Sequence, residues 1–421
     1  MSSAQSILQA VFGYEQFRGP QQAIVSHVIN GGDALVLMPT GGGKSLCYQV
    51  PAIARQQLGH GVTIVVSPLI ALMHDQVGAL HEAGISAAFL NSTLSYDETQ
   101  EVELRLQSGD ITLLYVAPER LNTPRFLGLL DDLLAQGKLS LFAIDEAHCI
   151  SDWGHDFRPD YRRIGQVLAR LPRNIAVLAT TATANQRVAR DVAAQLGGGV
   201  SVQRDPLVRE SLALQSIQMP GPAERLAWLA DHIPALPGSG IVYTLTTRDA
   251  DRVAEWLRGN GVDAHAYHSG KSDEERQALE QALLTNGIKC LVATTALGMG
   301  YDKPDLTFVV HYQTPGNVVA YYQQVGRAGR AIPDAYGVLL SGEEEDDINE
   351  YFRDSAFPPE WQVNRILEAL DAADEGMKVR EIERAVNLRQ SQIEKVLKLL
   401  VVEPQSPVMR IEGAWYRTPN P

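Results

Sequence analysis

The sequence predicts an α/β protein with two tandem parallel-sheet domains, residues 1–205 and 206–342, and a small winged-helix-like domain at 343–421. Short apolar, β-branched runs alternate with longer amphipathic stretches in both halves, and polar residues follow the end of each run. After these halves the pattern changes to three helical periods and a hairpin. At 421 residues the chain is also too long for one ordinary core.

In the first domain, parallel strands are expected at 34–38, 62–66, 111–116, 139–144 and 175–179. Ligands of such sheets bind at the carboxyl ends of the strands. The polar motifs of this chain follow the same strand ends, so a binding site is expected there.

The first run leads into a glycine-rich loop, Pro39–Ser45, and then into an apolar stretch that predicts a helix from Leu46. Glycines permit a backbone that wraps closely around phosphate oxygens, Lys44 offers a positive charge, and the Ser45 hydroxyl can ligate Mg²⁺. Met38 stands where the usual pattern has its first glycine. The nucleotide-binding residues expected in this loop are Thr40, Gly41, Gly42, Gly43, Lys44 and Ser45.

An acidic pair, Asp145 and Glu146, follows the apolar run at 139–144. Asp145 would hold Mg²⁺ directly or through water, and Glu146 would polarise the attacking water. The loop and the acidic pair together predict a nucleoside triphosphatase.

The second domain is expected to contain strands at 241–243, 264–267, 290–294, 308–312 and 337–340. It has no phosphate loop of its own. It does carry Arg327 and Arg330, three residues apart on a predicted helix, so that both could face one target. A cationic finger from a facing domain stabilises transition-state charge and contributes about 10³-fold or more, which favours this role over a surface basic helix.

Composition excludes several classes of protein. No apolar run is long enough to span a bilayer, the N-terminus lacks a secretory signal, and the three cysteines are dispersed, which together predict a reducing cytoplasm and no membrane partner. The net charge of −14 argues against a basic coat for indiscriminate nucleic-acid binding, but a cleft can be locally positive. The acidic run at 343–347 is expected to be a solvated boundary.

The last segment predicts a winged helix-turn-helix. Such folds bind duplex DNA or protein, and the cations of the third helix, Arg389, Lys395 and Lys398, leave both alternatives open. Its helices are expected at 361–373, 379–386 and 390–402, with a hairpin at 408–417 that turns at Glu412-Gly413.

From about Phe12 to Leu340 the chain resembles the RecQ family of superfamily 2 DNA helicases. The segments that carry the resemblance are 12–22, 67–73, 117–121, 149–159, 180–183, 293–304 and 323–330, beside the loop and the acidic pair. The family implies two RecA-like domains, the use of ATP and Mg²⁺, and 3′ to 5′ movement along single-stranded DNA. A bacterial member would act in the cytoplasm beside the nucleoid.

The resemblance also implies roles in nucleotide binding. Gln21 would read the adenine edge by paired hydrogen bonds, while Tyr14 and Arg18 would stack on its faces. In the second domain, Asp302 and Gln323 would couple the cleft to the nucleotide.

By the same resemblance, Arg330 would be the transition-state finger and Arg327 a γ-phosphate or interdomain partner. Ser67 and Pro68 belong to a segment that would grip the DNA backbone or couple the nucleotide to it.

The stretch after the acidic pair is similar to the aromatic-rich loop by which these enzymes sense single-stranded DNA. Trp153 and Phe157 offer stacking faces to any base, and Arg158 adds charge and cation–π reach. An aromatic cluster packed under a loop is the alternative for the stretch. His155 belongs to the same loop, where a histidine bonded within its own loop is the alternative.

The chain departs from the family pattern at the zinc module, which in the family usually has four cysteines and precedes the winged helix. Residues 341–360 contain no cysteine, so no structural zinc is expected. By position, Trp415 and Tyr416 of the hairpin are then the candidate strand-separating wedge.

The sequence therefore predicts an ATP- and Mg²⁺-dependent helicase whose partners are single-stranded and partly duplex DNA. Three alternatives remain open: a DNA-stimulated ATPase or translocase without robust unwinding, an RNA helicase, and an ATP-gated DNA-binding scaffold. No protein partner is predicted.

Overall fold

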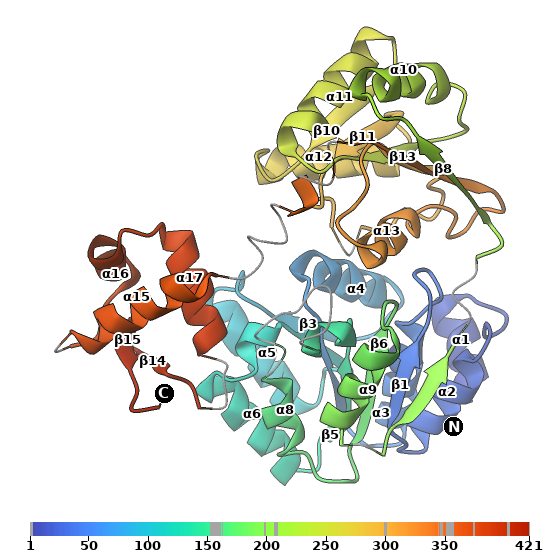
Figure 1. Cartoon of the computed structure of the whole chain (residues 1–421). Helices are drawn as coiled ribbons and strands as arrows, with labels where there is room; N and C mark the ends of the chain where they lie inside the picture. The colour runs from blue at the N-terminus through green and yellow to red at the C-terminus, as the bar shows by residue number, and fades with distance from the viewer. Residues whose placement is uncertain are drawn as a thin grey trace.

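The computed structural model describes residues 3–420 except 152–160, 162, 198, 206–208, 299–300, 344, 346–347, 351–357, 374 and 402–404. The described strands form two parallel sheets and one antiparallel hairpin. Figure 1 shows the first sheet with its helices at the bottom, the second above it, and a small helical module beside the first. None of the described helices is long and apolar enough to cross a membrane.

The first sheet has seven parallel strands in the order β3-β4-β2-β5-β6-β1-β7. The five expected strands are confirmed, whereas β3 and β7 were missed because β3 contains no β-branched residue and β7 is an edge strand without apolar continuity. The strands are β1 (Ala34–Leu37), β2 (Val62–Val66), β3 (Ala87–Leu90), β4 (Leu113–Val116), β5 (Leu139–Ile144), β6 (Ala176–Thr181) and β7 (Ser201–Arg204).

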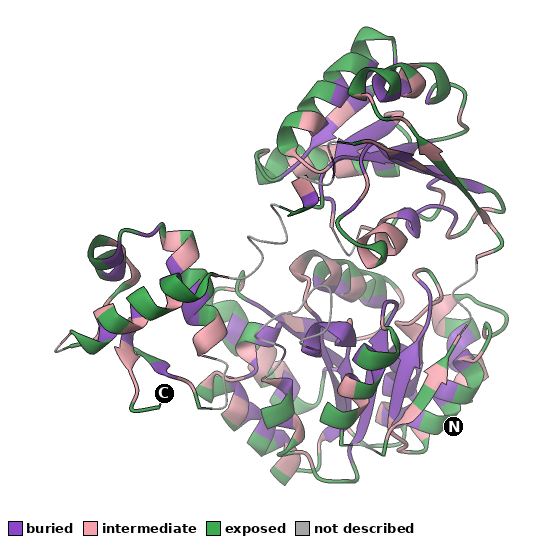
Figure 2. Cartoon of the chain, viewed as in Figure 1, coloured by how far each residue is buried: buried purple, intermediate pink, exposed green. Residues whose placement is uncertain are grey.

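Helices cover both faces of this sheet, and Figure 2 shows its strands buried between them. Strands buried on both faces explain why their sequences are continuously apolar. The helices are α1 (Ala4–Phe12), α2 (Gln21–Ile29), α3 (Leu46–Gln57), α4 (Ile70–Glu82), α5 (Tyr96–Ser108), α6 (Pro124–Ala135), α8 (Ile164–Leu168) and α9 (Gln186–Gln195), with short 3₁₀ turns η1 (Pro118–Arg120) and η2 (Ala147–Ile150).

The second sheet has six parallel strands in the order β10-β11-β9-β12-β13-β8. Its five expected strands are confirmed, and β8 was missed because most of its side chains are exposed on this edge. The elements are β8 (Leu212–Gln218), α10 (Pro222–His232), β9 (Gly240–Tyr243), α11 (Thr247–Gly259), β10 (Ala264–Tyr267), α12 (Asp273–Leu284), β11 (Cys290–Ala293), β12 (Phe308–His311), α13 (Val318–Val325) and β13 (Ala335–Ser341).

The C-terminal module contains the expected three helices and hairpin. Glu412 (φ 49°) and Gly413 (φ 85°) form its turn, as the left-handed backbone of a tight hairpin requires. Its apolar core combines all three helices with both strands. The elements are α15 (Glu360–Asp371), α16 (Val379–Val386), α17 (Gln390–Leu400), β14 (Val408–Ile411) and β15 (Ala414–Arg417).

Glu345, in the acidic run after β13, is buried, whereas the sequence predicts that this run is a solvated boundary. Glu343 is exposed, but Glu345 is only 3% exposed, and its Oε1 lies 3.0 Å from Nη1 of Arg225 in α10. The same oxygen accepts a hydrogen bond from the backbone N–H of Gly342. A buried carboxylate needs a paired cation and further hydrogen bonds, so this ion pair anchors the chain to the second domain as it leaves β13.

Candidate active site

The phosphate loop joins β1 to α3 in a backbone shape that only glycine adopts without strain. Gly41 (φ 77°) and Gly43 (φ 75°) are left-handed, and a Cβ on Gly42 would lie 3.0 Å from the carbonyl oxygen of Pro39. Immediately afterwards α3 begins at Leu46 as predicted. The loop and the first residue of α3 line one cavity, and a glycine-rich loop that leads into a helix N-terminus is suited to phosphate.

A cavity of about 490 Å³ opens at this loop and draws its walls from both domains. It holds ten of the residues expected at the nucleotide or the metal: Tyr14, Thr40, Gly41, Gly43, Lys44, Ser45, Asp145, Glu146, Asp302 and Arg330. Gly42, Arg18, Gln21, Gln323 and Arg327 do not line it. The topology explains the meeting, because β1 and β5 flank β6 and end at the same edge of the sheet.

Asp145 is a buried carboxylate at the end of β5. Its Oδ1 accepts hydrogen bonds from the Thr180 hydroxyl at 2.8 Å and from the backbone N–H of Glu146 at 3.0 Å. Burial, and next the charge of Glu146, raise the pKa of Asp145 to about 6, while Lys44 opposes the shift. A buried carboxylate beside a serine hydroxyl is a hard-oxygen set that fits Mg²⁺. Asp145 and Ser45 would hold that ion.

Glu146 has a left-handed backbone, with φ 48° and ψ 46°, at the start of η2. Such a conformation is costly for a residue with a side chain and is typical of functional sites. It brings the Oε2 of Glu146 within 3.2 Å of Nδ1 of His148, which in turn lies 3.0 Å from the Thr181 hydroxyl. Glu146 lines the cavity together with Asp145.

The two arginines expected on one helix lie on none, which corrects the sequence prediction. Helix α13 ends at Val325, and the left-handed Gly329 (φ 69°) turns the chain between the two arginines. Arg327 is buried within the second domain and donates to the carbonyls of Gly298 and Tyr301. A spacing of three residues aligns side chains only inside a helix, so the two arginines point to different targets.

Arg330 reaches the phosphate loop from the facing domain. A Cβ on Gly41 would lie 3.2 Å from its Cγ, and its Nη1 forms an ion pair with Asp302 at 2.6 Å. Arg330 and Asp302 both line the cavity. Of the two arginines, only Arg330 lines the cavity beside the phosphate loop.

Gln21 is occupied by protein groups in this structure. Its side chain is nearly buried, accepts from the backbone N–H of Arg18 at 2.8 Å and donates to the carbonyl of Gly42 at 2.8 Å. It therefore holds the phosphate loop through the carbonyl of Gly42. The recognition of adenine by Gln21 stays a prediction. The guanidinium carbon of Arg18 lies 5.9 Å from the ring centre of Tyr14.

Gln323 is a predicted residue of the second domain whose side chain contacts the first domain. Its Nε2 lies 3.4 Å from the Thr183 hydroxyl, which is 3.5 Å from Nδ1 of His148. Because His148 also contacts Glu146, a chain of polar side chains joins the second domain to the Glu146 carboxylate. Gln323 contacts the site through this chain.

Of the predicted DNA-contacting residues, only Ser67 and Pro68 lie in the described part of the chain. Trp153, His155, Phe157 and Arg158 lie outside the described residues. Ser67 is buried just after β2, where its backbone N–H donates to Val116, and Pro68 follows it at a half-buried position.

The proposed wedge residues face different surroundings. Trp415 is 6% exposed and belongs to the core of the C-terminal module, whereas Tyr416 is half-buried. The exposed apolar side chains of the hairpin are instead Met409 and Ile411.

Sequence reasoning missed the walls of the cavity away from the phosphate loop. Gln49 and Gln76, from α3 and α4, meet there through a 2.7 Å hydrogen bond. Apolar residues of α1 and α4, such as Phe12 and Leu80, complete the wall near Tyr14. The spacing from Ser45 to Gln49, one helical turn, was the only signal of this role in the sequence.

The fold and the cavity place the chain in the helicase class of proteins, and each parallel-sheet domain matches a helicase family model. Residues 18–192 match the family model for the DEAD/DEAH box helicase, and residues 224–332 match that for the Helicase conserved C-terminal domain. Both matches lie on the two parallel sheets described above.

Relatives specify the family more closely. The chain is 40% identical over 339 residues to the ATP-dependent DNA helicase RecQ of Pasteurella multocida, covering 80% of this chain and 52% of that protein. It is 39% identical over 351 residues to the RecQ of a Synechocystis strain, covering 81% of this chain and 71% of that protein. The chain belongs to the RecQ family. It spans about half the length of the RecQ proteins of Pasteurella multocida, Haemophilus influenzae and Bacillus subtilis.

Solved structures agree on the fold. The Mycobacterium smegmatis helicase Lhr bound to ssDNA and AMP-PNP has a TM-score of 0.64 at 19% identity and covers 99% of this chain and 60% of that chain. Saccharomyces cerevisiae Dbp5 bound to RNA and ADP BeF3 has a TM-score of 0.62 at 17% identity, covering 83% and 91%. At these identities the likeness shows the fold alone.

Proposed function

We propose that this protein is an ATP- and Mg²⁺-dependent DNA helicase that moves 3′ to 5′ along single-stranded DNA and unwinds duplex DNA. The observation that carries the proposal is the cavity shared by both domains, with Lys44, Asp145 and Glu146 on one wall and Arg330 on the other. The RecQ relatives, which are named DNA helicases, support DNA over RNA. The cellular site of action would be the cytoplasm, beside the nucleoid in a bacterium.

Each cavity residue has a role that its position supports. Lys44 binds the terminal phosphates, and Ser45 and Asp145 would hold Mg²⁺, which would neutralise charge on the phosphate oxygens. Glu146 orients the attacking water and accepts its proton. Arg330 stabilises the charge that develops on the transferred phosphoryl group.

Hydrolysis would be coupled to DNA through the interdomain chain of Gln323, Thr183 and His148. Closure on ATP and reopening after hydrolysis would change this chain and move the domains along the DNA backbone. The aromatic stretch with Trp153 and Phe157 would stack on bases, and Ser67 and Pro68 would contact the backbone. The aromatic stretch is close in sequence to Glu146, so binding of a DNA strand to it would reposition the Glu146 carboxylate.

A DNA-stimulated translocase without robust unwinding is the second candidate. The cysteine-free segment at 341–360 and the burial of Trp415 favour it, because both reduce the means of separating strands.

ATP hydrolysis without nucleic acid, with single-stranded DNA and with single-stranded RNA, beside unwinding of duplexes with a 3′ or a 5′ overhang, tests the proposal. We expect stimulation by DNA and unwinding from the 3′ overhang. In Glu146→Gln, nucleotide binding should persist while turnover falls about 10²-fold or more, because the group that accepts the proton is lost. DNA stimulation without unwinding would favour the translocase, stimulation by RNA alone would favour an RNA helicase, and normal turnover of Glu146→Gln would overturn the assignment of that residue.

A further inference from the structure

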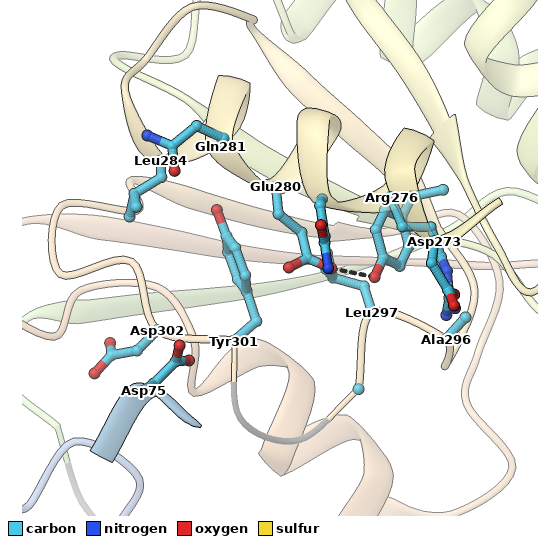
Figure 3. A pocket seen from close by; sticks show the side chains of 13 residues that line it. Asp75, Asp273, Arg276, Glu280, Gln281, Leu284, Ala296, Leu297, Tyr301 and Asp302 are labelled. Atoms are coloured by element: carbon cyan, nitrogen blue, oxygen red, sulfur yellow. Dashed lines mark hydrogen bonds and ion pairs between the residues drawn. The ribbon is translucent and has the colours of Figure 1, made fainter. Parts of the chain in front are cut away.

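A second cavity, of about 540 Å³, lies between the two domains next to the nucleotide cavity. Among the described residues of the first domain, Asp75 of α4 is the only one that lines it, and Asp302 lines both cavities. Figure 3 shows Asp75 at this wall beside Asp302, with the side chains of α12 opposite. Whatever Asp75 does across this cavity therefore acts between the domains.

The facing wall is acidic. Glu280 of α12 accepts a hydrogen bond from the Tyr267 hydroxyl, and Asp302 is the partner of Arg330. Among the described lining residues, Arg276 is the one basic side chain, and it is ion-paired with Asp273. Asp75 forms no ion pair with any described residue, so no salt bridge neutralises its charge at this wall.

The surroundings of Asp75 disfavour its charged form. Partial burial raises the pKa of Asp75, the charge of Glu280 raises it further and Asp302 adds a smaller effect, while His74 opposes them. The residue remains exposed, so solvent and salt screen the repulsion.

The repulsion acts in the arrangement in which the domains touch. Gln323 and Thr183 are 3.4 Å apart across the interface, and Arg330 packs on Gly41 of the phosphate loop. In an opened arrangement the same carboxylates would separate, so the like charges penalise only the closed state.

We infer that Asp75 is a positioning residue that limits domain closure, because its charge opposes the approach of Glu280 and Asp302. The inference rests on the proposed ATP-driven closure and deepens it: the repulsion stores no energy in the open state and promotes reopening after hydrolysis. A residue that destabilises only the closed state weakens nucleotide binding and speeds product release.

The test is the affinity of the full chain for a non-hydrolysable ATP analogue with Mg²⁺, and the rate of ADP release, both without DNA. At low salt, Asp75→Asn and Glu280→Gln should each tighten binding about two- to fivefold and slow ADP release, the range expected for exposed charge pairs. The gain should disappear at high salt. Steady-state KM and kcat should both fall.

Matched variants separate charge from structure. Asp75→Glu keeps the charge and should bind as the unmodified chain does, and so should Glu82→Gln, which neutralises an exposed carboxylate on the same helix that lines neither cavity. The double variant of Asp75→Asn and Glu280→Gln should gain less than the product of the single gains, because both remove one shared repulsion.

Three outcomes would overturn the inference. They are an unchanged nucleotide affinity in Asp75→Asn, an effect of Asp75→Glu equal to that of Asp75→Asn, and a gain in the double variant equal to the product of the two single gains. Because nucleotide binding is measured without DNA, a chain that hydrolyses ATP without unwinding leaves the inference standing. A chain that unwinds normally but shows no effect at Asp75 loses the inference alone.

Discussion

The carboxylate of Asp145 illustrates how burial tunes one residue. It lies at the end of β5, beside Glu146, and its pKa is raised to about 6 chiefly by loss of hydration. The Thr180 hydroxyl donates to the charged form and opposes this shift. The protonated carboxyl cannot hold a cation, so the metal-binding form is lost at a higher pH than for an exposed aspartate.

We therefore expect kcat/KM for MgATP to fall as the pH is lowered from 7 toward 5. Thr180→Val removes a hydrogen bond to the charged form, so the pKa of Asp145 should rise and the acidic limb should move to higher pH. Thr180→Ser keeps the hydroxyl and serves as the control. A pH profile in which both variants share one acidic limb would contradict this account.

At the scale of the element, the hairpin β14–β15 has one face in the module and one in solvent. Trp415 packs in the core, and its backbone N–H and C=O pair with Met377. Met409, on the neighbouring strand, is 43% exposed. Alternation along a strand places these side chains on opposite faces.

Trp415→Ala should destabilise the C-terminal module by about 3–5 kcal/mol, because it leaves a cavity in a small core. Hydrogen–deuterium exchange across α16 and α17 is the measurement, and exchange should accelerate there and not in the two parallel sheets. Met409→Ala should change exchange little, as exposed substitutions do. Equal behaviour of the two variants would remove Trp415 from the core. Tests of a strand-separating wedge therefore belong on Met409 and Ile411.

For the whole molecule, the decisive feature is that one cavity is completed by two domains. Gln323 contacts Thr183 across the interface but does not line that cavity. Its contribution is therefore expected in the coupling between domains, which is a free energy distinct from nucleotide affinity.

Gln323→Ala should retain nucleotide affinity and reduce the stimulation of ATP hydrolysis by single-stranded DNA about tenfold, within the usual range of coupling free energies. Val318→Ala, at an exposed position of the same helix, is the control. Paired measurements of nucleotide binding and of hydrolysis with and without DNA check the prediction. Lost binding, or intact stimulation, would contradict it.

Much of the fold and the core of the site could be predicted because the signals are local. The strands β1 and β5 are continuous apolar runs, and the residues after them, Lys44 and Asp145, carry their chemistry wherever parallel strands end. The edge strands β7 and β8 were not predicted, because strands whose side chains are partly exposed lack a continuous apolar run. The chemistry of these motifs followed from residue type and order alone.

By itself, the sequence determined that the chain folds as two parallel-sheet domains with a phosphate loop and an acidic pair, since glycine conformations and apolar runs are properties of neighbouring residues. Tertiary structure decided which distant groups meet. It directs Arg327 into the interior of the second domain and Arg330 toward Gly41. It also buries Glu345 against Arg225 and places Asp75 opposite the carboxylates of α12. Such contacts depend on where a helix ends and how two domains face each other, and no local pattern encodes either.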